Sequence, residues 1–445
     1  MSGFRLSPQQ RRLFELSAVG GERLTAGAAF RITGELDLDR FRHAVALLLE
    51  RFEILTTGFP RVPGLALPVQ RPGERVDAEV ACAAVDSLAQ GERAWRRLFP
   101  ASEPVADAPP PVRLLLESRG EREHLLVWTQ PALLGDAASL GNQVDELLRL
   151  YRSTDSPGSG DADPGAEPPL QYADLAEWLN EVVEDEAAAE GPAFWEARSG
   201  AATPPPFPLL RADVGERFEP RLCPLPLTAD TQAALRRHAT DLGLELEALL
   251  HAAWAALLTR YADGAPLSVD TLFDGRSYES LDDAVRLFAH YLPIRCQASD
   301  AETIGELAAR LTEECAAQAE WQEYFVPARP EAGGRATAYG FSYFDLPPRA
   351  SGDLRVEVEA TQALLEPHVL ELVCLDRGAD AQLRLGLVFD HAALAERDAA
   401  AVASAFAALC DDLTRHPARP LDELSLVADD ADGALEAPEA PEVAA

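Results

Sequence analysis

The chain has 445 residues, 47% of them hydrophobic, and its formal net charge is −35 at pH 7. This charge argues against nucleic acid or an anionic membrane as a partner, because an acidic surface repels both. All 39 basic residues are arginines. A Schiff-base lysine and a phosphate-loop lysine are therefore excluded.

The sequence pattern also bears on the compartment. No run approaches the roughly 20 consecutive apolar residues that span a membrane. The first residues lack the basic and apolar regions of a signal peptide. Six cysteines are scattered without a Cys-x-x-Cys pair. We therefore expect reduced cysteines in the core of a cytoplasmic protein.

Helices and strands are both predicted in the first part of the chain. Ser7 followed by Pro8 is typical of a helix start, with a capping residue before a proline at the first helical position. Asp37 or Asp39 is expected to cap a second helix, whose apolar residues share one face. Strands are expected at residues 28–33, 112–117 and 124–129.

Residues 123–151 combine a buried strand, a short turn and an amphipathic helix. The turn reads Pro131-Ala-Leu-Leu-Gly-Asp-Ala-Ala-Ser139. Residues 152–169 then have the Pro, Gly, Ser and Asp composition of a loop or linker.

The second part of the chain repeats the mixture of elements. Helices are expected at residues 244–261, 304–322 and 397–416. Strands are expected at residues 267–272, 291–296, 339–344, 354–358, 369–374 and 383–389. We predict a mixed α/β (α+β) protein with an N-terminal lobe at 1–170 and a C-terminal lobe at 171–427. Residues 428–445 are expected to form a disordered acidic Ala/Pro tail or linker.

Six segments, in order along the chain, carry a family resemblance. They are residues 6–16, 51–59, 131–139, 172–178, 285–295 and 406–426. Tyr172-Ala-Asp-Leu-Ala-Glu-Trp178 matches a Tyr-x-Asp-x-Ala-x-Trp motif fully, and the others match in part. Together they resemble the condensation domains of nonribosomal peptide synthetases, within the chloramphenicol acetyltransferase-like superfamily.

The resemblance implies a fold and a chemistry. The fold would be two chloramphenicol acetyltransferase-like lobes in a V, with a tunnel at their interface. Acyl or peptidyl carrier proteins would bring donor and acceptor on 4'-phosphopantetheine arms, with other synthetase domains as further partners. The chain itself would bind no cofactor, and its histidines lack metal-ligand spacing.

The core motif of that family, His-His-x-x-x-Asp-Gly-x-Ser, is degenerate in this sequence. Its two histidines fall on Pro131 and Ala132, while Asp136 and Ser139 are in register. The family's Asp is chiefly structural, so we expect Asp136 to be buried against an arginine, either Arg51 or Arg295. Ser139 is expected to cap the following helix.

His290 occupies the position of an asparagine in the segment 285–295 and is a candidate substitute base. A polar lining residue or a hydrogen-bonded core histidine is the alternative. Residues expected to bind substrate are Pro131, Gly135, Ser139, Tyr291, Ser342 and Tyr343. If the basic segment forms a helix that exposes both its arginines and its tryptophan, it would dock an acidic carrier protein or its phosphopantetheine; a solvated helix is the alternative. The segment consists of Arg93, Trp95, Arg96 and Arg97.

Three functions are compatible with these residues. The first is an amide-forming condensation domain that lacks the usual histidine. The second is a non-catalytic module that docks, gates or recruits a partner on an assembly line. The third is a standalone acyltransferase with a soluble acceptor, which is disfavoured because such enzymes also need the missing histidine. The sequence favours the first.

Overall fold

The computed structural model describes most of the chain between residues 3 and 427. The described ranges are 3–20, 24–73, 78–90, 92–98, 112–153, 171–184, 189–198, 207–211, 218–225, 227–277, 281–299, 301–327, 339–378 and 381–427. Most of the predicted linker and the whole predicted tail therefore lie outside the described residues.

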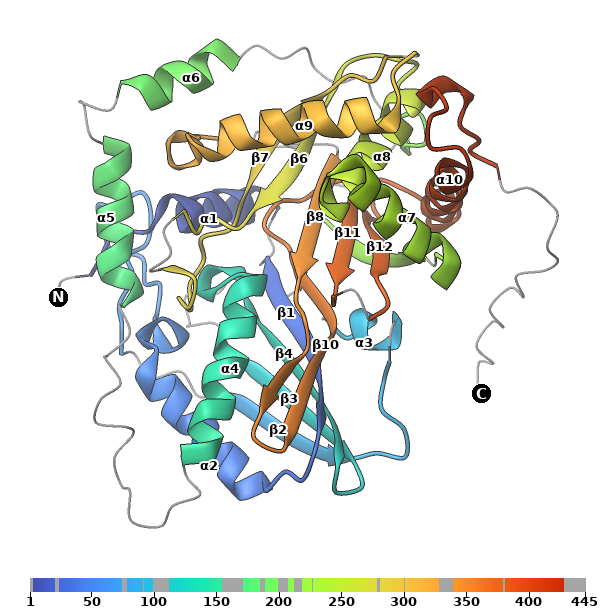
Figure 1. Ribbon diagram of the computed structural model, residues 1–445. Coiled ribbons are helices and arrows are strands. Elements are labelled where there is room, and N and C mark those ends of the chain that lie inside the picture. Colours follow the sequence, from blue (N-terminus) through green and yellow to red (C-terminus); the bar gives the residue numbers. More distant parts are fainter. Residues whose placement is uncertain are drawn as a thin grey trace.

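Two six-stranded sheets form the centre of the molecule (Figure 1). The first sheet has the order β2 (Glu79–Ala84), β3 (Arg113–Arg119), β4 (Glu123–Pro131), β1 (Thr25–Thr33), β10 (Leu354–Ala363) and β9 (Arg349–Ser351). The second has the order β5 (Pro220–Leu225), β12 (Arg384–Asp390), β11 (Leu370–Asp376), β8 (Tyr339–Asp345), β6 (Leu267–Phe273) and β7 (His290–Cys296). Each sheet contains parallel and antiparallel pairs, which confirms the predicted mixed architecture.

Helices cover the two sheets separately (Figure 1). α2 (Leu38–Arg51) and α4 (Ala137–Ser153) pack together against the first sheet. The second sheet is flanked by α7 (Ala229–Leu242), α8 (Leu246–Tyr261), α9 (Ile304–Ala319) and α10 (Glu396–Arg415). The remaining helices are α1 (Pro8–Gly20), α3 (Glu92–Arg96), α5 (Tyr172–Glu184) and α6 (Glu190–Arg198), with short 3-10 turns η1 (Glu53–Thr56), η2 (Ala132–Leu134), η4 (Gln322–Tyr324) and η5 (Leu421–Glu423).

Local sequence explains several of these boundaries. Asp37 caps α2 by accepting hydrogen bonds from the backbone N–H of Asp39 and Arg40, so the cap is Asp37 and not Asp39. Thr303 and Glu306 form a capping box at the start of α9. The helix predicted at 304–322 ends at Ala319, and η4 follows it. α5 and α6 were not predicted.

No single boundary in the sequence separates the strands of the two sheets. β9 and β10 lie late in the sequence, yet β10 pairs with β1 over eight residue positions of the first sheet. β10 then leads directly to β11 of the second sheet. Val373, Leu375 and Val388, on β11 and β12, belong to the same apolar cluster as the core of the first sheet. The second sheet therefore packs one of its faces onto the first lobe.

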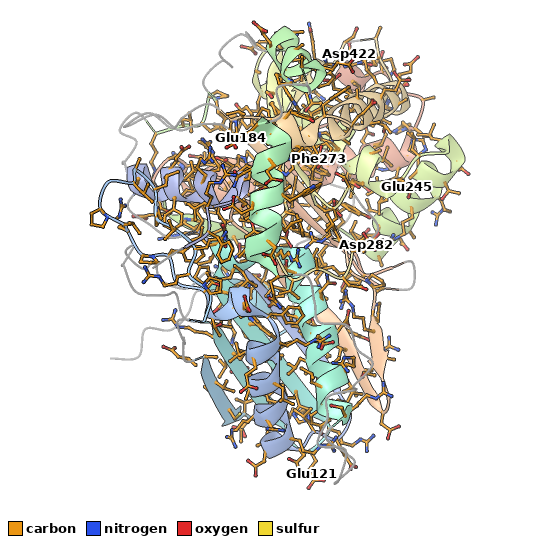
Figure 2. The ribbon with its side chains drawn as sticks, turned by 90° about the vertical axis from the view of Figure 1, so that its left-hand side faces the viewer. Glu121, Glu184, Glu245, Phe273, Asp282 and Asp422 are labelled. Atoms are coloured by element: carbon orange, nitrogen blue, oxygen red, sulfur yellow. The ribbon has the colours of Figure 1, made fainter. Side chains whose placement is uncertain are left out.

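α5 crosses the junction between the two halves, as Figure 2 shows with Glu184 labelled near its upper end. The hydroxyl of Tyr172 lies 2.7 Å from the Ser7 Oγ and donates a hydrogen bond to the carbonyl of Leu287. Tyr172 thus joins three of the segments that carry the resemblance. Within the described ranges, no single helix is long and apolar enough to cross a membrane; only α7 and α8 together, bent by 105°, reach that length and composition.

Candidate functional site

The turn of the core motif lies between the end of β4 and the start of α4. β4 pairs with β3 and β1, and the N–H of Ala132 donates to the carbonyl of Leu24. These bonds hold the main chain where the histidines of the motif would stand. The Ala132 side chain is 0% exposed. Ala132, which the motif alignment pairs with the second histidine, is therefore a small, buried, non-ionisable group.

Asp136 connects this turn to the second lobe. Its carboxylate pairs with both terminal nitrogens of Arg276, at 3.0 and 3.2 Å. It also accepts the backbone N–H groups of Phe288 and Ala289, at 2.9 and 3.0 Å. Burial raises the pKa of Asp136, but the Arg276 guanidinium and the backbone donors outweigh burial and hold it below its ordinary value. Asp136 is therefore a buried carboxylate anion, with its charge compensated across the lobe junction.

The arginine that pairs with Asp136 differs from the two we expected. Arg51 pairs with Glu146 on α4, and Arg295 is exposed at the end of β7. Arg276 follows Gly275, which has φ of +70° and contacts the backbone at Phe288. A Cβ at Gly275 would lie 2.3 Å from the carbonyl oxygen of Phe288. This left-handed, crowded turn needs glycine, and it directs Arg276 to Asp136.

We expected Ser139 to cap α4, but it does not. Asp136 has that role, because its Oδ1 accepts the N–H of Ser139 at 2.8 Å and its carbonyl accepts the N–H of Leu140. Ser139 lies within the first turn, and its Oγ accepts the N–H of Arg286 at 2.8 Å. It therefore reinforces the same connection between the lobes.

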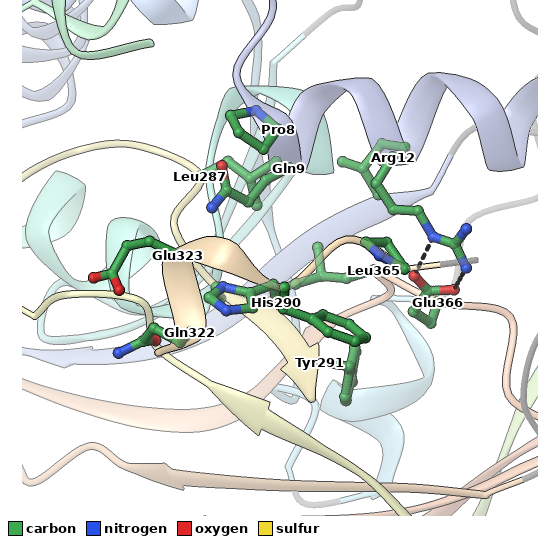
Figure 3. Close-up of a pocket in the computed structure, with 14 residues that line it drawn as sticks. Pro8, Gln9, Arg12, Leu287, His290, Tyr291, Gln322, Glu323, Leu365 and Glu366 are labelled. Carbon is green, nitrogen blue, oxygen red and sulfur yellow. Dashed lines mark hydrogen bonds and ion pairs between the residues drawn. The ribbon is translucent and has the colours of Figure 1, made fainter. Parts of the chain in front are cut away.

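A small hollow that is partly open to solvent lies close to this connection. It is bounded by α1, the start of β7, η4 and the segment after β10 (Figure 3). His290 and Tyr291 are the two predicted site residues that line it. Arg12 and Glu366 form a bidentate ion pair at one side, with distances of 2.6 and 2.9 Å. Ala132 and the rest of the core turn do not line this hollow.

The environment of His290 favours a neutral imidazole. Burial lowers its pKa, against the opposing effects of the Phe288 and Gln322 backbone and of nearby carboxylates. The Phe288 carbonyl lies 2.9 Å from Nδ1, so Nδ1 carries the proton and donates it to that carbonyl. Nε2 then holds the lone pair, and it has no hydrogen-bond partner among the described residues. Because Ala289 bonds to Asp136, this ring is one residue away from the connection between the lobes.

Behind Tyr291 lies a buried polar cluster. The Tyr291 hydroxyl donates to Glu371 at 2.6 Å and lies 2.9 Å from the Oγ of Ser342. His368 stands between Asp270 and Glu371, and these carboxylates outweigh burial to raise the pKa of His368 to about 10. Ser342 is therefore buried inside the second lobe, where it bonds to Tyr291 and Glu371.

Two other predicted groups have different surroundings from those expected. The Tyr343 hydroxyl donates to Asp376, which pairs with Arg236. Arg93 and Arg96 on α3 and Arg97 directly after it are exposed, but Trp95 is only 3% exposed. Its ring packs against β12, where a Cβ at Gly386 would lie 3.3 Å from it. Trp95 is therefore a core residue, and the idea that this helix exposes it was wrong.

Sequence reasoning missed Arg276, Gln9, Arg12 and Glu366. A signal for Arg276 was present, since Asp274-Gly275 is a turn dipeptide directly before it. Arg12 and Glu366 are 354 residues apart, so no local pattern could pair them.

Comparisons with known proteins agree with this geometry. The family model described as "Condensation domain" matches residues 3–325. Surfactin synthase subunit 2 of Bacillus subtilis (strain 168) is 27% identical over 328 residues, which cover 72% of this chain and 9% of that protein. Bacitracin synthase 3 of Bacillus licheniformis is 25% identical over 330 residues, covering 72% of this chain and 5% of that protein. The chain thus spans less than a tenth of the length of these relatives.

Solved structures share the fold over nearly the whole chain. The X-domain in its complex with OxyB from teicoplanin biosynthesis has a TM-score of 0.73 and 22% identity, covering 97% of both chains. The condensation domain of the monacolin K polyketide synthase MokA has a TM-score of 0.76 and 18% identity, covering 95% of this chain and 99% of that one. The first condensation domain of the CDA synthetase has a TM-score of 0.74 and 16% identity, with the same coverage. The through-going tunnel stays a prediction.

Proposed function

Because this chain belongs to the condensation-domain family of nonribosomal peptide synthetases, we propose that it forms amide bonds without the family's histidine. The donor is an acyl or peptidyl thioester on one carrier protein, and the acceptor is the amine of an aminoacyl group on another. Both arrive on 4'-phosphopantetheine arms, in nonribosomal peptide or hybrid polyketide biosynthesis. The amine nitrogen attacks the thioester carbonyl, the C–S bond breaks, and the thiol leaves with the proton that the nitrogen loses.

The observation that carries this proposal is the connection made by Asp136. The carboxylate is bound to Arg276, Phe288 and Ala289 of the second lobe although the neighbouring base is missing. The core turn thus keeps a fixed position at the lobe junction. A fixed junction is what positioning two carrier-bound reactants requires.

The energetics favour an amine acceptor. Positioning two reactants can supply an effective molarity of about 10⁵–10⁸ M, whereas a general base contributes about 10²–10⁴-fold. An α-amine has a pKa near ~8, so roughly a tenth is already the free nucleophile at pH 7. A hydroxyl depends far more on a base, so amide formation is favoured over ester formation.

The direct test is product formation from loaded donor and acceptor carrier proteins, measured by intact-protein mass spectrometry. We expect condensation product with the wild-type domain, and a faster rate after Ala132→His. His290→Ala should slow the reaction no more than about tenfold if positioning dominates. A loss of about 10²–10⁴-fold, with a rate that rises with pH, would instead identify His290 as the base. Arg122→Gln, an exposed change on the β3–β4 turn, serves as the control.

A recruitment module is the second candidate, favoured by a different observation. The side chain at the position of the base is Ala132, fully buried, and the fold is shared with an X-domain solved in complex with OxyB. On this alternative the V-shaped fold binds a partner protein and performs no chemistry. Absence of product across several loaded carrier pairs, with carrier binding retained, would favour it.

A further inference from the structure

A group of arginines gathers around one buried carboxylate where the two sheets meet. Glu359 on β10 is 5% exposed at its side chain and pairs with Arg31 on β1 at 2.7 Å. It also pairs with Arg384, the first residue of β12, at 2.6 Å. Arg377, just after β11, is close enough to lower the pKa of Glu359 together with Arg31 and Arg384, against the opposing effect of burial. Two guanidinium groups therefore pair with this carboxylate, and a third lies within electrostatic range of it.

The charges in this cluster do not balance. Three cations and one anion leave two positive charges, in a chain whose net charge is −35. Burial lowers the pKa of Arg384, and repulsion from Arg377 and Arg31 adds to that effect while Glu359 opposes it. Like charges held this close are unfavourable unless an anion joins them.

The donors in the cluster are also incompletely used. Among the residues that the structure describes, none pairs with Arg377, and its Nε is buried without a hydrogen-bond partner in that part of the chain. The Nη1 of Arg384 is likewise buried and unpaired. A buried donor without an acceptor costs about 1–3 kcal/mol. A ligand with several hydrogen-bond acceptors, bound at this cluster, would satisfy the unpaired donors of Arg377 and Arg384.

The cluster is reachable from solvent at the junction of the sheets. The side chains of Arg31 and Arg384 are 19% and 17% exposed. The end of β11 and the start of β12 lie beside β10 and α3 (Figure 1). Arg96 at the end of α3 pairs with Glu92, and Arg97 directly after it pairs with Glu117, so the excess positive charge is confined to the cluster itself.

We propose that Arg31, Arg377 and Arg384 form an anion site that binds the phosphate of a 4'-phosphopantetheine arm. A phosphate group has several oxygens on a tetrahedral frame, so more than one guanidinium can donate to it while Arg31 and Arg384 keep Glu359. The identity of the arm rests on the proposed function, whereas the preference for a phosphate rests on the arginines alone. Arg377 supplies the unpaired guanidinium and is the residue whose loss matters most.

The test is calorimetric titration of the full chain with 4'-phosphopantetheine, pantetheine and inorganic phosphate. We expect phosphopantetheine to bind at least tenfold more tightly than pantetheine, and its affinity to fall with added salt. Arg377→Gln should weaken phosphopantetheine about tenfold and leave pantetheine unchanged. Because Arg377 makes no ion pair with another described residue, this variant should keep the wild-type melting temperature. Arg122→Gln removes the same charge at an exposed site and should change nothing.

Each result has a defined meaning. Equal affinity for phosphopantetheine and pantetheine, or an equal effect of Arg377→Gln and Arg122→Gln, overturns the site. Inorganic phosphate binding as tightly as phosphopantetheine, and lost in Arg377→Gln, overturns the assignment to the arm. Phosphate-dependent binding without any condensation product leaves the site standing and refutes the proposed function. Condensation product, together with equal affinity for phosphopantetheine and pantetheine, supports the proposed function and refutes the site.

Discussion

Removing the Asp136 carboxylate should destabilise the protein more than any other single change in the core turn. In Asp136→Ala, the Arg276 guanidinium, with 3% of its side chain exposed, loses its anionic partner. The N–H groups of Phe288 and Ala289 lose their acceptor at the same time. Breaking a buried pair costs about 3–5 kcal/mol, because the remaining charge is left uncompensated.

A double-mutant cycle measured by urea denaturation checks this origin. Arg276→Leu removes the buried cation, so Asp136→Ala should cost much less in that background than in the wild type. The exposed pair of Asp39 and Arg42 is the control, since exposed pairs contribute only about 0–1 kcal/mol. If Asp136→Ala unfolds at the wild-type urea concentration, or if the two changes are additive, the structural role assigned to Asp136 is refuted.

The same carboxylate predicts a pH dependence. The pKa of Asp136 is lower in the folded protein than its ordinary value. Its stabilising effect is therefore fully present above the unfolded pKa of about 3.9 and is lost as pH falls through the folded pKa. The stability difference between the wild type and Asp136→Ala should stay constant from pH 7 to about 5 and shrink below pH 4. A difference that already shrinks between pH 7 and 5 would contradict this.

Three further changes test other parts of the fold. Burial lowers the pKa of His251 to about 4, so protonation of the unfolded state should cost the wild type about 3 kcal/mol between pH 6.5 and 4. His251→Gln should remove that loss in urea titrations at the two pH values, and an unchanged loss would contradict a buried neutral ring. Gly275→Ala should lower the melting temperature and weaken carrier-dependent activity, because the new Cβ meets the Phe288 carbonyl; a wild-type melting curve would show that the turn adapts. Thr303→Ala removes the cap of α9 and should cost about 1 kcal/mol of unfolding free energy, against no change in exposed Ser404→Ala.

Local pattern was enough to locate much of the secondary structure. The strands expected at 339–344, 369–374 and 383–389 overlap β8, β11 and β12, because their apolar runs are buried on both faces. The helix predicted at 244–261 overlaps α8, with Trp254 at its fully buried centre.

Long-range partners could not be predicted in the same way. Arg276 is 140 residues from Asp136 and lies outside the six segments that carry the resemblance, from two of which the candidates Arg51 and Arg295 were taken. The burial of Trp95 could not be predicted locally, because α3 has only five residues, too few to show which face is apolar. The pairing of β1 with β10 depends on tertiary packing, since strand periodicity carries no information about the partner.

That pairing also matters while the protein is being made. Arg31 and Glu359 are bonded across 328 residues of chain. At a synthesis rate of about 5–20 residues per second, roughly 15–60 seconds separate the emergence of β1 from that of β10. During this interval one edge of β1 has no strand to pair with, and an unpaired edge is a template for aggregation. The nascent first lobe is therefore prone to aggregate at this edge, and a fragment ending before β10 is expected to aggregate.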